Sequence, residues 1–204
     1  MAKPRNEKKP KIDQSRNRSF SIIELLVVIA IISILSALIL VSFHNVKTKA
    51  CNVRAMGEVR AISQALELYF MDNNYKYPCD VNRDLPPGLE KYLSTNPEWP
   101  KAPWPGSVYD WDYWAPSGFD SGCAGSLSHE PKDKPVYQIS VRFCDINGDN
   151  CNFPKEKWAE GFDSKSSVYW CLEGPCRAHG SYPYDHPGCC MGGACPADQP
   201  ECGF

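Results

Sequence analysis

Residues 18–41 read RSFSIIELLVVIAIISILSALILV, and this stretch decides how the chain begins to fold. From Phe20 onward it is apolar apart from three serines and one carboxylate, that of Glu24. The 22 residues from Phe20 to Val41 would form about 33 Å of helix, enough to cross a bilayer. We therefore predict a transmembrane or filament-core helix over residues 20–43. A lone acid in such a segment is costly and indicates a functional site whose partner comes from elsewhere.

The charges on either side of this segment predict its orientation. Residues 1–19 carry seven of the 22 Lys and Arg and two of the 24 Asp and Glu, a net +5, and the remainder carries 15 and 22, a net −7. Because positive flanks stay in the cytoplasm, residues 1–19 are predicted to be a cytoplasmic leader and residues 44–204 an exterior domain. This predicts a single-pass protein of the cytoplasmic membrane. The exterior part has no basic patch with interleaved aromatic residues, so nucleic-acid binding has no support.

The hydrophobic pattern predicts an α+β exterior domain. Val59, Ile62 and Leu66 follow the period of a helix, which would continue from the membrane to about residue 70. A short helix is expected over 86–93, and alternating segments over 107–114, 136–144 and 167–172 predict strands. We expect the second half of the long helix to pack on this small antiparallel sheet. The tail from about residue 174 is rich in Gly, Pro and Cys and is expected to be irregular.

Cysteine usage agrees with an exported domain. Ten of the eleven cysteines lie beyond the long helix, and such density outside the cytoplasm is typical of a disulfide framework. The sequence does not give their pairing. Cys51, on the helix, can pair with a neighbour, cross-link within the fold or remain a buried free thiol, which we favour. The disulfide candidates are Cys79, Cys123, Cys144, Cys151, Cys171, Cys176, Cys189, Cys190, Cys195 and Cys202.

The basic leader, the small residue, Phe20 and the run SIIELLVVIAIISILSALIL together resemble the class III signal of type IV pilins and type II secretion pseudopilins. The resemblance implies that a prepilin peptidase cuts between Ser19 and Phe20 and methylates the new amine of Phe20. Ser19 stands where the family usually has Gly. Glu24 would then be the fifth mature residue, which in this family offsets the N-terminal amine of a neighbouring subunit.

The exterior domain is similar, in order, to the major pseudopilin pattern. The segments that carry this similarity are NNYKYPCD at 73–80, WPKAPWPGSVYDWDYW at 99–114 and YQISVRFCDINGDN at 137–150. The resemblance implies a structural, non-enzymatic subunit of a pilus or a type II secretion pseudopilus. Its implied partners are copies of itself, other pilin-like subunits, the prepilin peptidase, the inner-membrane assembly platform and the membrane. Its implied final location is an extracytoplasmic or cell-surface filament.

The segment 145–150 contains a candidate calcium loop. Asp145, Asn147 and Asp149 place oxygen ligands at alternate positions, as calcium-binding loops do. Major pseudopilins hold calcium in a loop after their sheet, which adds to this hypothesis. The alternative is a polar turn clamped by Cys144 and Cys151.

Other groups of residues suggest alternative sites and functions. A zinc site would need ligands from His179, His186, Cys189, Cys190 and Cys195, but their spacing matches no tight pair of ligand pairs. The aromatic residues Trp99, Trp104, Tyr109, Trp111, Tyr113 and Trp114 predict a small core rather than a binding platform. No catalytic motif occurs, so an exported enzyme has no support. A minor tip adhesin and a membrane-anchored, disulfide-rich binding domain remain as alternatives.

Overall fold

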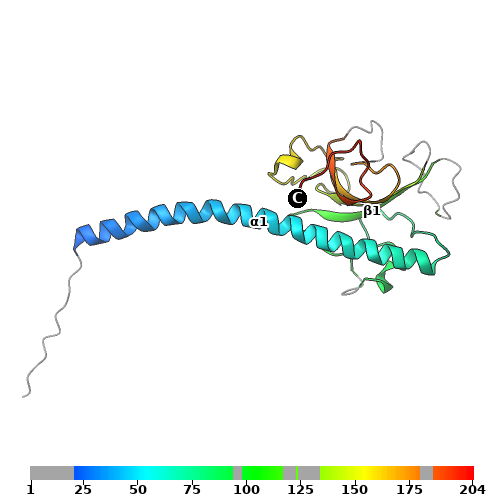
Figure 1. The fold of residues 1–204 in the computed structure, drawn as a ribbon, viewed down its shortest axis with the longest axis horizontal. Helices are drawn as coiled ribbons and strands as arrows, with labels where there is room; N and C mark the ends of the chain where they lie inside the picture. The colour runs from blue at the N-terminus through cyan, green and yellow to red at the C-terminus, as the bar shows by residue number, and fades with distance from the viewer. Residues whose placement is uncertain (1–20, 94–97, 117–122, 124–133, 180–185) are drawn as a thin grey trace, which may run out of the picture. The chain divides into compact units, whose positions relative to one another are not determined.

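The computed structural model describes residues 21–93, 98–116, 123, 134–179 and 186–204, without the side chains of 39–45. The predicted leader and the predicted cleavage site, Ser19 and Phe20, lie outside these residues. The chain divides into two compact units, residues 1–45 and 46–204. Helix α1, Ile22–Asp72, contains 51 residues and belongs to both units (Figure 1). The predicted long N-terminal helix is therefore confirmed.

Local sequence explains where α1 is uninterrupted and where it ends. No proline occurs within it, and Gly57 is its only glycine. At its end Asn74 adopts a left-handed backbone with φ 55°. The Tyr75 amide donates to the Phe70 carbonyl at 2.9 Å, which is the 6→1 hydrogen bond of a Schellman-type helix end.

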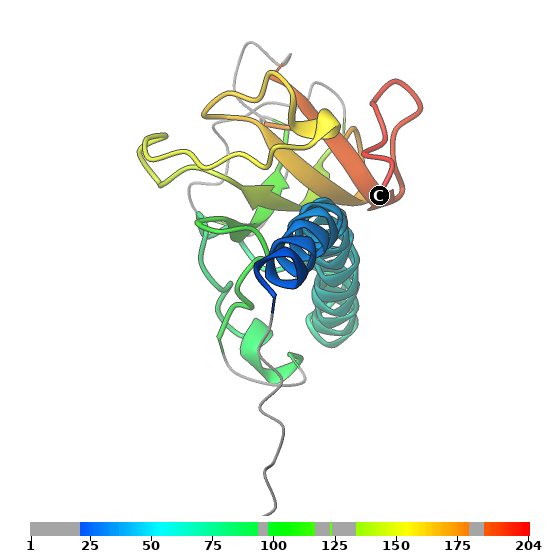
Figure 2. The ribbon, with the colours of Figure 1, turned by 90° about the vertical axis from the view of Figure 1, so that its left-hand side faces the viewer.

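The second unit contains a four-stranded sheet with the order β1-β2-β3-β4. The strands are β1 Val108–Trp114, β2 Val136–Arg142, β3 Ser167–Glu173 and β4 Gly188–Gly193. The β1–β2 and β2–β3 pairs are antiparallel, which confirms the three predicted strands. Figure 2 shows these strands layered against the helix of this unit.

The part of α1 in the second unit covers one face of the sheet with an apolar core. On the helix, Val59, Ile62 and Leu66 are fully or almost fully buried. They belong to the same core cluster as Trp111 of β1 and Ile139 of β2. The predicted aromatic core is therefore present in the structure, since most of the aromatic residues named above are buried. These are Trp104, Tyr109, Trp111, Tyr113 and Trp114, with Trp99 partly buried.

The fourth strand corrects two expectations. Strand β4 pairs with β3 in parallel, so the sheet is mixed rather than antiparallel, and the tail is not wholly irregular. Side chains of adjacent strand residues point to opposite faces, so Cys189 and Cys190 must take different partners. Cys189 belongs to the helix-side core and Cys190 to the cluster on the other face. The two bonds hold the C-terminal tail to β4, one on each face of this glycine-rich strand.

Five disulfides join the ten candidate cysteines of the exterior part. The bonds are Cys79–Cys123, Cys144–Cys151, Cys171–Cys176, Cys189–Cys202 and Cys190–Cys195. Cys51 is a half-buried free thiol. The short helix expected over 86–93 is a single 3-10 turn, Leu89–Lys91, because Gly88 precedes it in a left-handed conformation with φ 90°.

Candidate functional site

The first turn of α1 positions the one acid of the apolar segment. The Glu24 side chain accepts a hydrogen bond from the Ser21 amide, with Oε2 at 2.9 Å from the nitrogen. In return, the Ser21 hydroxyl oxygen accepts from the Ile23 amide at 3.3 Å. This is a capping box, in which Ser21 and Glu24 satisfy amide groups that a helix start leaves unpaired. The carboxylate is exposed and lies at the N-terminal end of the helix.

Apolar side chains surround this acid on every face of the helix. The large side chains from Ile22 to Leu38 are exposed, with exposed fractions from 45% at Val28 to 80% at Ile22. The Ser33 hydroxyl donates to the Ile29 carbonyl at 2.7 Å. This serine therefore adds no unsatisfied polar group to the segment. Among its described residues, the first unit thus presents one carboxylate within an exposed apolar surface.

Hydropathy gives a separate result for this segment. Within the part of the chain that the structure describes, no helix is both long enough and apolar enough to cross a membrane.

Comparison with known proteins addresses the same segment. Residues 14–40 match the family model of the prokaryotic N-terminal methylation motif. This range contains Ser19, Phe20 and Glu24. The chain therefore carries a segment similar to this methylation motif.

Part of the chain is also similar to curated proteins. It is 35% identical over 63 residues to the type II secretion system core protein G of Pectobacterium carotovorum subsp. carotovorum, which covers 31% of this chain and 40% of the relative. The Aeromonas hydrophila protein of that name is 34% identical over 67 residues, or 33% of this chain and 46% of the relative. The Escherichia coli (strain K12) protein is 35% identical over 63 residues, or 31% of this chain and 43% of the relative. The chain therefore spans less than half of each relative. No solved structure matches it significantly.

The second unit of the chain contains a buried charged network. Arg142 of β2 donates to Asp110 at 3.1 Å and to Asp112 at 2.9 Å, both on β1. All three side chains are almost fully buried. Gln138 donates to Asp112 at 3.0 Å, and the Ser140 hydroxyl also donates to Asp112. The network lies on the sheet face opposite the helix, because alternate residues of a strand face opposite sides.

A third acid lies beside this network. Asp80 accepts from the Tyr113 amide at 3.4 Å. Burial, with Asp112 and Asp110 adding to it, raises the pKa of Asp80 to about 8. Burial also raises the pKa of Asp112, although Arg142 opposes this shift. Because three carboxylates share a single buried guanidinium, ionisation of all three is unfavourable.

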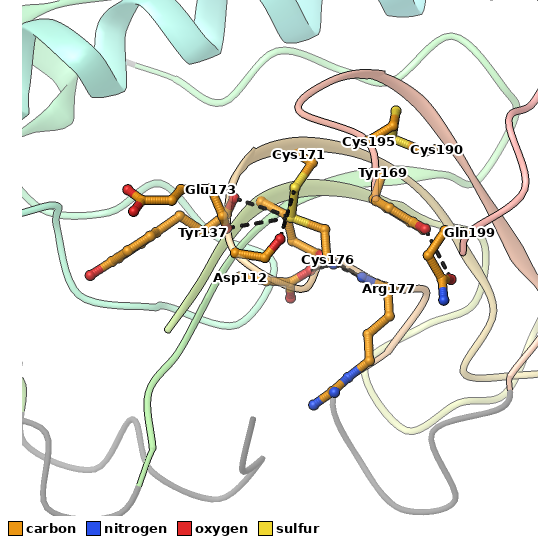
Figure 3. Close-up of a disulfide and its surroundings, with 12 residues drawn as sticks. Asp112, Tyr137, Tyr169, Cys171, Glu173, Cys176, Arg177, Cys190, Cys195 and Gln199 are labelled. Carbon is orange, nitrogen blue, oxygen red and sulfur yellow. Dashed lines mark hydrogen bonds between the residues drawn. A yellow bond between two sulfur atoms is a disulfide. The ribbon is translucent and has the colours of Figure 1, made fainter. Parts of the chain in front are cut away.

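The network fastens irregular segments to the sheet. Arg142 donates to the Ala178 carbonyl at 3.1 Å, and Gln138 donates to the Arg177 carbonyl at 2.8 Å. On the other side, the Arg83 amide donates to Asp110 at 2.7 Å. Figure 3 shows the Cys171–Cys176 bond next to the segment that Gln138 holds, with Asp112 and Arg177 nearby. These hydrogen bonds all join parts of the same unit, as expected of a network that holds irregular segments on a sheet.

Sequence analysis did not find this network. Asp110 and Asp112 could be placed on one face of a strand, and Arg142 on the polar side of another. The sequence did contain one signal for this network, an unusual set of polar residues along one face of a strand whose other face is apolar. Only the register, which pairs Asp112 with Gln138 and Asp110 with Ser140, brings the charges together.

The candidate calcium loop is arranged around Asp145. Its Oδ1 accepts from the Asn147 amide at 3.0 Å and from the Asp149 amide at 2.8 Å. Its Oδ2 accepts from the Asn150 side-chain amide at 2.7 Å. The side chains of Asn147 and Asp149 are exposed. Donor hydrogens therefore face both carboxylate oxygens of Asp145, which a calcium ion would need as ligands.

Disulfide bonds use all three cysteines among the five candidate zinc ligands. Cys189, Cys190 and Cys195 are all bonded to other cysteines, so none offers a thiolate. His186 contacts Asp163, with Nδ1 at 2.9 Å from Oδ2. Among the described residues, no group of three or more His, Cys, Asp or Glu is placed to hold a metal ion.

Proposed function

We propose that this chain is a structural subunit of a pilin-like filament, assembled through its N-terminal helix. The observation that carries the proposal is the single carboxylate of Glu24 within an exposed apolar helix, inside a segment that matches the methylation motif. Burial of that apolar surface among copies contributes about 25 cal/mol per Å² removed from water, an upper figure if the segment leaves lipid. The names of the relatives favour a filament of the type II secretion system over a surface pilus.

Before assembly, the precursor would reside in the cytoplasmic membrane with residues 20–43 in lipid and the basic leader inside. A prepilin peptidase would cut between Ser19 and Phe20 and methylate the Phe20 amine. The platform in the inner membrane would then extract the subunit. These stages are supported by the family match and by the charge difference between leader and exterior domain.

During extraction, the Phe20 amine of one subunit would pair with the Glu24 carboxylate of another. A buried carboxylate and a buried amine each cost much less when paired than alone. In the free subunit, the Ser21 amide already donates to Glu24. The incoming amine is charged, so it makes the stronger hydrogen bond and can replace or share this contact.

The capping box allows a test that separates charge from helix capping. Glu24→Gln keeps a residue type that completes a capping box but removes the charge. We expect this variant to remain folded and membrane-associated while its filament yield falls at least about tenfold, because an unpaired amine remains buried. Ser21→Ala, the matched control, weakens the cap and keeps the charge, so filaments should persist.

The measurement is the intact mass and N-terminal sequence of the chain in membranes and in sheared filaments, in cells with the assembly system. A chain that starts at methylated Phe20 in the sheared fraction supports the proposal. A chain that starts at Met1 and occurs only in membranes overturns it and favours the anchored binding domain. Normal filament yield from Glu24→Gln would refute the pairing alone.

A further inference from the structure

A disulfide and two backbone hydrogen bonds close the loop that follows β2. The Cys144–Cys151 bond joins its two stems. On the sheet side of the bond, the Asn152 amide donates to the Phe143 carbonyl at 2.9 Å. On the loop side, the Asp145 amide donates to the Asp149 carbonyl at 2.8 Å. The covalent bond is therefore flanked by a hydrogen bond on each side, and both stems are fixed before the loop turns.

The interior of the loop is filled by its own donors. Three donors converge on the Asp145 carboxylate, as described above, and the Gly148 amide donates to the Asp145 carbonyl at 2.9 Å. The hydrogen bond from Asn150, followed by that from the Asp149 amide, lowers the pKa of Asp145. Gly148 and Asn150 turn the chain in left-handed conformations, with φ of 82° and 51°. These turns aim the amides inward, where a cation would need carbonyl oxygens.

A positive charge already lies beside this loop. The Arg83 guanidinium donates to the Cys144 carbonyl at 2.6 Å. The backbone amide of the same residue donates to Asp110 in the buried network. The stem of the loop is thus connected, through one arginine, to the charged face of the sheet. This guanidinium also favours the ionised Asp145, a role that a bound cation would otherwise have.

We propose that the 144–151 loop is closed by thiol oxidation and not by a divalent cation. The Cys144–Cys151 bond provides the closure, and Asp145 organises the interior from its own chain. The alternating pattern that predicts calcium is then a set of hydrogen-bonding partners for one carboxylate. The fold of this region should respond to reductant and be indifferent to chelators. This inference does not depend on the filament proposal.

The test compares calcium with chelator on the full-length, detergent-solubilised chain. Near-UV circular dichroism gives Tm in millimolar CaCl2 and in excess EGTA. If the loop held calcium, a millimolar concentration would fill even a weak exterior site and stabilise the fold. Because we propose that it does not, we expect the two Tm values to differ by less than about 1 °C. Cys144→Ser/Cys151→Ser should lower Tm by roughly 5–15 °C, and calcium should not restore it.

Asp149→Asn is the matched control, because it removes a candidate calcium ligand and leaves the backbone donor to Asp145 in place. Its Tm should equal that of the parent chain in both solutions. Calorimetric titration with CaCl2 alone gives a second readout that requires no variant to fold. Heat of specific binding, a calcium-dependent Tm, or loss of either in Asp149→Asn would overturn the proposal. An unchanged Tm in the double serine variant would overturn it as well.

Discussion

The two faces of the sheet are covered in different ways. The face towards α1 packs apolar side chains of strands against one long regular helix, with Val59, Ile62 and Leu66 in the contact. The opposite face carries Asp110, Asp112 and Arg142, and irregular segments cover it. A helix offers a continuous apolar surface and satisfies its own backbone. Irregular segments leave amides and carbonyls unpaired, so the sheet that they cover must supply polar partners.

This difference also bears on two of the disulfides. Hydrophobic burial fixes the helix to its face without covalent help. The segments on the polar face are irregular, and their conformational entropy must be restrained by other means. The bonds Cys171–Cys176 and Cys190–Cys195 lie in or beside the cluster on that face (Figure 3). Cross-links of this kind stabilise mainly by restricting the unfolded chain.

The largest effect is expected from Arg142→Leu. This change leaves Asp110 and Asp112 buried without their cation and removes the donor to Ala178. Removing one partner of a buried pair costs about 3–5 kcal/mol. Urea unfolding of the oxidised chain, followed by tryptophan fluorescence, measures the loss. Asp110→Asn/Asp112→Asn in the Arg142→Leu background should recover part of it. A loss below about 1 kcal/mol would mean that this face behaves like an exposed ion pair.

A comparable or smaller loss is expected on the helix side. Leu66→Ala removes a side chain with 0% exposure and should cost about 2–5 kcal/mol through lost burial and a cavity. Leu68→Ala is the matched control on the same helix, because Leu68 is 50% exposed. Its unfolding free energy should change by less than about 0.5 kcal/mol. Equal losses in the two variants would contradict the assignment of the buried face.

The polar face should also respond to pH. Burial, with Asp112 and Asp110, raises the pKa of Asp80 to about 8 from the ordinary 3.8. The folded chain thus retains a proton that the unfolded chain releases near pH 4, and stability should decrease as pH rises from about 4 to about 8. Asp80→Asn removes this titration, so its stability should depend less on pH over this range. Denaturation at several pH values provides the measurement, and identical slopes for the two proteins would exclude Asp80 as the source.

Sequence and tertiary structure determine different parts of the molecule. Periodicity determined α1 and the three strands that alternate strongly, because burial of one face imposes a regular pattern on the residues. It missed β4, whose Gly188–Gly193 segment has almost no pattern and is held by parallel pairing and two disulfides. The aromatic residues of β1 were placed correctly in a core, since large apolar side chains seldom remain exposed in numbers.

The N-terminal site could be read from the sequence alone, because Ser21 and Glu24 are three residues apart and their capping box is a local interaction. The charged network could not, because Asp80, Asp112 and Arg142 are distant in sequence and meet only through strand register and loop placement. The same holds for the inward amides around Asp145, whose direction depends on left-handed turns at Gly148 and Asn150. Interactions between residues that are close in sequence can be predicted from their spacing. The pairing of buried charges, in contrast, is decided by the tertiary structure that excludes water from them.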